Sequence, residues 1–159
     1  MRRSTREVTG TENIAAMLDN LQVCRLGFCD GDMPYVVPMN FGYEMQDGKF
    51  VIYCHGATEG RKLDIIAKNP NVCFEADNMI KLIEAEEACG WSAYYESVIG
   101  SGRAEIVTDE AGKAHGLELV MARSGYQGTP KFPAAMLART AVIRLTLDEI
   151  SAKRHDEQQ

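Results

Sequence analysis

Apolar residues recur along this chain mainly with the alternating spacing of β-strands. Strands are predicted at residues 23–29, 35–43, 50–54, 71–76, 93–107 and 140–147. Helical spacing predicts helices over residues 11–21, 61–69 and 109–121, with Thr11 and Asp109 as N-caps, and a short helical tail over residues 148–154. Residues 78–90 fit either a strand or a loop. Short turns join most of the strands, which favours an antiparallel sheet or barrel with appended helices over a doubly wound fold.

Glycine and proline mark the breaks between these elements. Asp47-Gly48 predicts a hairpin turn, Pro70 ends the second helix, and Gly100 and Gly102 indicate a bulge or bend. Pro38 lies inside an apolar strand. Because proline cannot donate to a sheet ladder, it indicates an edge, a bulge or an irregular segment that faces a ligand.

Composition and charge narrow the classes of protein. The chain has 159 residues, 45% of them hydrophobic and 25% charged, which predicts one folded domain. A net charge of -6 disfavours a nucleic-acid partner, and no apolar run approaches the ~20 residues of a membrane span. The basic residues 1–7 lead into no apolar segment, and five cysteines are an odd number. We therefore expect a cytoplasmic protein with reduced thiols.

Arg61 and Lys62 form the most informative pair of side chains. They follow a strand and a glycine-bearing loop, and they fall in the first turn of a predicted helix. The helix dipole disfavours cations there, but free backbone N–H groups and two cations together suit a phosphate. A solvated pair partnered by Glu59 and Asp64 explains the same residues equally well. The glycine spacing does not match a Walker A loop.

Two further segments are candidates for ligand contact. Carbonyl groups freed by the proline in residues 37–41 suit a planar heterocycle, although a plain edge strand is the simpler explanation. Residues 89–95 hold the single tryptophan and two tyrosines, which suits ring stacking, a subunit interface or core packing equally. The cysteines and His55 lack zinc-site spacing, so we expect no metal, and we expect His115 and His155 in solvent.

The chain resembles the flavin-binding split-barrel proteins related to pyridoxamine 5'-phosphate oxidase, and most of all the nitroimidazole-resistance (Nim-type) group. The similar segments follow the family order over nearly the whole chain: residues 23–27, 34–43, 55–57, 60–64, 69–75, 89–92, 95–100, 102–105 and 139–144. The chain departs from the pattern at residues 57–59, where some relatives carry a lysine or serine.

The resemblance implies a fold and a cofactor. It implies a mainly β protein with appended helices, a six-stranded antiparallel split β-barrel, as a single domain over residues 1–159. It further implies a homodimer with flavin mononucleotide (FMN) in the groove between subunits. The residues it places around FMN are Arg61 and Lys62 on the phosphate, Pro38, Met39 and Asn40 along the ring, and Trp91, Ser92 and Ser97 from the other subunit.

The resemblance also implies a reaction, because Nim-type relatives are described as reducing a nitroimidazole to an amine. The expected function is an FMN-dependent oxidoreductase with a small-molecule substrate and an electron donor, in which His55 borders the substrate as a catalytic residue. Two alternatives stay open. One is a module that binds flavin, or haem with His55 as axial ligand, without fast catalysis. The other is a pyridoxamine-phosphate oxidase, although the chain lacks that enzyme's C-terminal basic motif.

Overall fold

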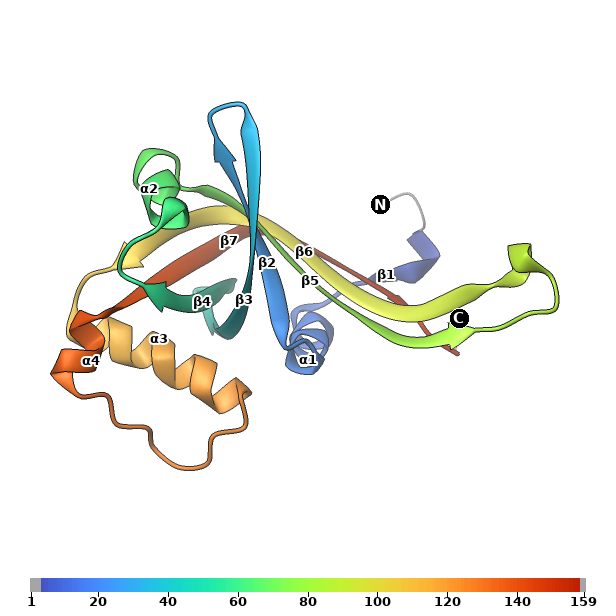
Figure 1. Cartoon of the computed structure of the whole chain (residues 1–159). Helices are drawn as coiled ribbons and strands as arrows, with labels where there is room; N and C mark the ends of the chain where they lie inside the picture. Colours follow the sequence, from blue (N-terminus) through green and yellow to red (C-terminus); the bar gives the residue numbers. More distant parts are fainter. Residues whose placement is uncertain (1–3, 158–159) are drawn as a thin grey trace.

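The computed structural model describes residues 4–157 and shows one twisted antiparallel sheet that closes on itself (Figure 1). Six strands form the ring in the order β7-β4-β3-β2-β5-β6, and β6 pairs back with β7. Their bounds are β2 Val23–Asp30, β3 Met33–Gln46, β4 Lys49–Ala57, β5 Asn71–Ile83, β6 Ser92–Val107 and β7 Thr140–His155. A short strand, β1 Glu7–Val8, pairs with the end of β7. The expected six-stranded split barrel is confirmed.

Alternation along the strands builds the barrel interior. On β2, Cys24, Leu26 and Phe28 point inward and are buried, while their neighbours are more exposed. On β4, both faces are buried over residues 50–54, because Ile52 faces the barrel core and Tyr53 faces a second core under the helices. The unbroken apolar run of this strand therefore reflects two cores, one on each side.

Helices cover the barrel at separate places. Helix α1, Thr11–Asn20, packs its apolar stripe into the barrel core, and α2, Arg61–Lys68, follows β4. Helix α3, Glu110–Arg123, lies across β3 and β4 with the short α4, Ala134–Ala138, beside it (Figure 1). The short 3₁₀ turns are Ser4–Arg6 and Ala88–Gly90.

Two glycines allow α3 to lie close to the sheet. A Cβ on Gly42 of β3 would come within 2.5 Å of the Leu119 backbone, and one on Gly116 of α3 within 2.7 Å of the Tyr53 ring. Any larger side chain at either position would push the helix away from the sheet. The second core, between α3 and β4, depends on this close approach.

Two sequence predictions about local structure are wrong. Residues 148–154 are not helical, because β7 continues to His155 and pairs with β6 throughout. Within this pairing, the register of β6 against β7 shifts between Ser101 and Gly102, which confirms the predicted bulge. Glycine is required at position 102, because a Cβ there would lie 1.9 Å from the Thr146 carbonyl oxygen. Thr11 is not an N-cap, since α1 begins at Thr11 itself after Gly10, without a side-chain cap.

Other predictions of local structure are confirmed. Asp109 caps α3 by accepting a hydrogen bond from the Gly112 N–H at 2.7 Å. Asp47 and Gly48 both adopt positive φ, as a tight hairpin turn requires. The ambiguous residues 78–90 divide: residues 78–83 belong to β5, and residues 84–90 form a connection that includes the 3₁₀ turn.

Arg123 ties the end of α3 to the end of α1. Its Nη2 donates to the carbonyl oxygens of Leu18 and Leu21, and its guanidinium lies 4.5 Å from the centre of the Phe41 ring. The side chain is only 13% exposed. A cation at the C-terminus of α1 also complements the helix dipole.

We expect Arg123→Met to lower the free energy of unfolding by about 2–4 kcal/mol, because it leaves buried carbonyls without their charged donor. Arg139→Met, at an exposed arginine after α4, is the matched control and should change stability by under about 0.5 kcal/mol. Urea unfolding curves measure both. Equal curves for the two variants would show that the Arg123 contacts contribute nothing.

Candidate functional site

The barrel opens where β3 separates from β4. Strand β3 pairs with β2 over Met33–Asn40, but it pairs with β4 only from Phe41 onward, opposite Cys54. Within residues 4–157, no strand pairs with the second edge of the first half of β3. Pro38 lies in this half, so the predicted edge position is confirmed. The free edge presents backbone groups that no neighbouring strand uses.

Helix α2 begins beside this opening. Its N-cap residue, Gly60, supplies no side-chain hydrogen bond. The first N–H groups that bond within the turn are those of Leu63 and Asp64, which both donate to the Gly60 carbonyl. Arg61 and Lys62 therefore occupy the first turn as the sequence predicts, at an N-terminus without a side-chain cap.

Arg61 is held by the β2–β3 hairpin rather than by its own helix. Its Nε and Nη2 donate to Asp30 at 3.0 and 2.9 Å, and the guanidinium lies 4.6 Å from the centre of the Tyr35 ring. The idea that Glu59 and Asp64 partner the cation is therefore wrong for Arg61. The contact joins the start of α2 to the free half of β3.

Lys62 extends in a different direction, toward the end of β4. A Cβ on Gly56 would lie 3.1 Å from its Nζ, so the glycine leaves room for the ammonium group. Cys54 lies just before, with its Sγ 3.8 Å from that of Cys24. The hydrogen bond with Cys24 and complete burial raise the pKa of the Cys54 thiol well above its usual value, while Lys62 acts to lower it. The positive charge of Lys62 therefore interacts with a thiol in the barrel wall.

His55 faces the opposite side of β4 from Cys54, as alternation requires. Its ring is exposed and borders a cavity of ≈ 440 Å³ that α3, α4 and the loop between them enclose. On the sheet, His55 pairs with Val142 of β7. His55 and Lys62 therefore lie near the same end of β4 but on different faces of the strand.

The three residues that the resemblance assigns to the other subunit lie on a long arm made by β5 and β6, which projects from the barrel on the side away from α2 (Figure 1). Trp91 is half exposed near the tip of the arm and donates from Nε1 to the Ala85 carbonyl at 2.8 Å. Ser92 begins β6, and Ser97 pairs with Asp77 and Lys153 further along. Within one chain, the fold does not bring these residues to Arg61 and Lys62.

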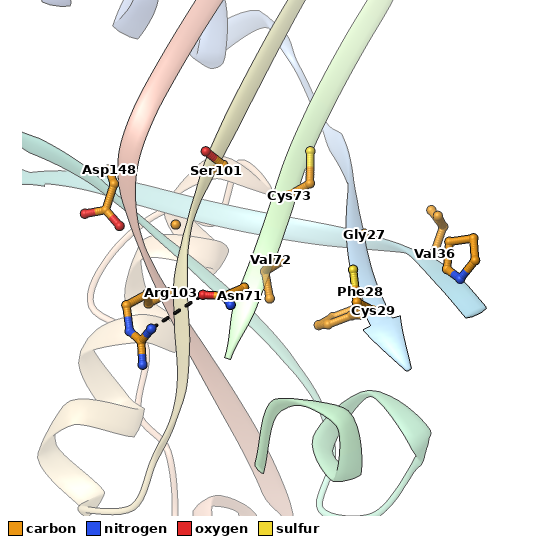
Figure 2. A pocket seen from close by; sticks show the side chains of 12 residues that line it. Gly27, Phe28, Cys29, Val36, Asn71, Val72, Cys73, Ser101, Arg103 and Asp148 are labelled. Atoms are coloured by element: carbon orange, nitrogen blue, oxygen red, sulfur yellow. Dashed lines mark hydrogen bonds between the residues drawn. The ribbon is translucent and has the colours of Figure 1, made fainter. Parts of the chain in front are cut away.

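Two larger hollows contain none of the predicted site residues. One, of ≈ 640 Å³, lies on the outer face of the barrel between Cys29, Cys73 and Arg103, where Arg103 donates to Asn71 (Figure 2). The other, of ≈ 630 Å³, is strongly polar and includes His115, whose Nε2 lies 3.0 Å from Glu44 Oε2.

The other two histidines both make contacts with neighbouring elements. His115 contacts Glu44 and the Tyr53 ring, and His155 donates from Nδ1 to the Ala93 carbonyl at 2.7 Å. His115 is nevertheless exposed, as expected, whereas His155 is partly buried. The burial of His155 was not expected, because the pairing of β7 with β6 could not be read from the tail sequence. Among residues 4–157, no cluster of histidine, cysteine and carboxylate groups has the geometry to hold a metal ion. Within the same residues, none of the helices has the length and apolar character that a membrane crossing requires.

Comparison with known proteins places the chain in a family. The family model for pyridoxamine 5'-phosphate oxidase matches residues 10–154. A candidate 5-nitroimidazole antibiotic resistance protein from Bacteroides thetaiotaomicron has 27% identity, with 95% of this chain and 90% of that chain covered and a TM-score of 0.79. The flavocytochrome Anf3 from Azotobacter vinelandii has 25% identity, with 99% and 76% covered and a TM-score of 0.79.

A third solved structure has the same fold at a lower sequence identity. An FAD- and haem-binding protein from Mycobacterium smegmatis has 20% identity and a TM-score of 0.77, with 95% of this chain and 74% of that chain covered. No curated protein matches the chain. The match over residues 10–154 and the closed antiparallel ring agree, and the chain belongs to the pyridoxamine 5'-phosphate oxidase family.

Proposed function

We propose that this protein is an FMN-dependent oxidoreductase that reduces a nitroaromatic or nitroimidazole-type small molecule with electrons from a separate donor. The observation that carries the proposal is the free edge of β3 beside an α2 N-terminus that bears Arg61 and Lys62. The cation–π contact between Arg61 and Tyr35 joins the two parts. The similarity to the Bacteroides protein supports the class of substrate.

The residues present fit FMN. Uncapped N–H groups, a guanidinium and an ammonium at one helix start match the phosphate, since charge-assisted bonds to phosphate are the strong ones. The Asp30 carboxylate accepts from Nε and Nη2 of Arg61, so Nη1 is available to donate to the phosphate. Backbone groups at Pro38, Met39 and Asn40 on the free edge match the polar rim of the isoalloxazine ring. FMN supplies hydride or electron transfer when it is bound.

Haem binding is the second candidate function. The observation that favours it is the exposed His55 at an apolar cavity, and two structurally similar proteins are described as a flavocytochrome and as an FAD- and haem-binding protein. The absorption spectrum of the purified protein separates the two. The two visible bands of oxidised flavin support the FMN proposal, and a Soret band supports haem.

The arm points to a homodimer. Near its tip, residues 81–83 of β5 pair only with residues 92–94 of β6, and a two-stranded ribbon is marginally stable by itself. Large apolar side chains there are about half exposed: Met79, Ile80, Leu82 and Trp91. In the proposed dimer, the arm packs on the second subunit and brings Trp91, Ser92 and Ser97 to the FMN site of that subunit.

We expect light scattering to give the mass of a dimer at micromolar concentration, because an obligate interface of this kind often buries more than about 2,000 Å². Leu82→Asp should shift the equilibrium toward monomer and reduce FMN binding together with it. A wild-type monomer that holds FMN would contradict the shared site.

We expect the double variant Arg61→Ala/Lys62→Ala to weaken FMN binding by about 100-fold or more, because each charge-assisted bond to phosphate contributes roughly 1.5–3 kcal/mol. Riboflavin, which has no phosphate, should bind the variant and the wild type almost equally. Fluorescence titration of both flavins makes the comparison. An equal loss for riboflavin would mean that the pair supports folding rather than the phosphate.

His55 is the proposed proton donor to the substrate. Its imidazole is exposed at the end of β4, the end that leads into α2, and it borders the cavity. A protonated imidazole at this place donates to an oxygen of the bound nitro group as that oxygen gains negative charge. General acid catalysis of this kind contributes typically 10²–10⁴-fold.

We expect His55→Gln to lower anaerobic turnover of a nitro substrate by roughly 10²–10⁴-fold with FMN affinity little changed. His115→Gln, in the polar hollow on the same sheet face, is the control and should keep its turnover. Unchanged turnover in His55→Gln with FMN bound would remove His55 from the reaction. Loss of FMN alone would show that the residue only orders the loop.

A further inference from the structure

A cavity of ≈ 440 Å³ lies between the end of β4, α3, α4 and the loop of residues 124–133. We propose that it is the substrate pocket, and that it selects a flat apolar ring that carries an anionic substituent. This inference rests on the proposed function and deepens it. The volume falls within the range of small-molecule sites, about 300–1,000 Å³.

The wall of the cavity is apolar and partly uncovered. Tyr126 and Met136 line it and are 47% and 41% exposed. Phe132 lines it from the loop and packs on the second core. An aromatic ring and a thioether at an open wall offer a surface on which a planar ring can lie.

The floor of the cavity is rigid. Leu117 and Val120 of α3 line it and belong to the second core, which also includes Tyr53 and Val142. The close approach of Gly116 to Tyr53 holds α3 against β4. The loop above contains Gly125 and Gly128, both at positive φ, so its path needs these glycines. The packing of α3 on β4 therefore fixes the floor of the pocket.

The charges around the cavity favour an anion. Its lining holds His55 and Lys131 but no aspartate or glutamate, in a chain whose net charge is -6. The polar hollow with His115 is lined by three carboxylates, those of Glu44, Glu105 and Asp109, and by one guanidinium, that of Arg144, so its carboxylates outnumber its guanidinium. The outer hollow is lined by one cation, Arg103, and one anion, Asp148, so no single sign of charge dominates it. Lys131, an exposed lining residue, is the residue we assign to the anionic substituent.

The test compares two ligands with the same ring, 4-nitrobenzoate and the neutral nitrobenzene, by equilibrium dialysis against the purified FMN-loaded protein. We expect the wild type to bind the carboxylate roughly tenfold more tightly, because an ionised partner strengthens the contact with Lys131. Lys131→Gln should abolish this preference. Tyr126→Ser should weaken both ligands by about three- to tenfold, because it removes the stacking wall.

Lys49→Gln is the matched control, since Lys49 is an exposed lysine at the other end of β4. It should keep the wild-type preference. Equal binding of the two ligands by the wild type, or the same preference in Lys131→Gln and Lys49→Gln, would overturn the proposed pocket.

Turnover of 4-nitrobenzoate on the same samples separates this inference from the proposed function. Selective binding without nitro reduction would refute the reaction and leave the pocket standing. Nitro reduction with the same KM in wild type, Lys131→Gln and Tyr126→Ser would refute the pocket and leave the reaction standing.

Discussion

The separation of β3 from β4 at Phe41 and Cys54 is the constraint on which the proposed site depends. Up to that point β4 pairs with both β3 and β7, but beyond it His55, Gly56 and Ala57 pair with β7 alone. The first half of β3 then runs beside β2 with its other edge free. A fully closed ladder would use those backbone groups and leave nothing for a ligand to pair with.

Helix α2 starts where this opening ends. The chain leaves β4 after Ala57 and enters the helix at Arg61, so the first turn of α2 lies near the β2–β3 hairpin that holds Arg61 through Asp30 and Tyr35. Two cations at a helix start are unfavourable for an isolated helix. A phosphate bound at this place would offset the unfavourable interaction of the two cations with the helix dipole. The presence of Arg61 and Lys62 at the start of α2 therefore supports the proposed function.

Much of the fold follows from local sequence patterns. The predictions that are wrong concern segments whose structure depends on partners far away in the sequence. The alternation in β2 and the run in β4 predict strands, and Pro38 predicts the edge that the structure contains. The end of β7 could not be predicted, because the pairing of Ala152 and its neighbours with β6 and β1 overrides a weak helical pattern. Pairing partners far along the chain decide such a segment, and its own composition does not.

The same difference between local patterns and long-range contacts applies to the candidate site. Arg61 and Lys62 stand out from spacing alone, but their partners Asp30, Tyr35 and Gly56 come from other strands and gave no local signal. The cavity beside His55 was also missed, because α3, α4 and the glycine-containing loop assemble it from positions scattered over 80 residues of chain or more. Only the resemblance to a known family connects Trp91 to the same site. Within one chain, Trp91 lies just before β6, on the arm that projects away from α2 (Figure 1).

Amide hydrogen exchange with and without FMN tests the central claim most directly, because it reports on backbone groups rather than on side chains. The account predicts that FMN slows exchange in two separate segments, residues 35–41 on the free edge of β3 and residues 60–64 at the start of α2. Slowing confined to other parts of the chain, with both of these segments exchanging as fast as before, would contradict it.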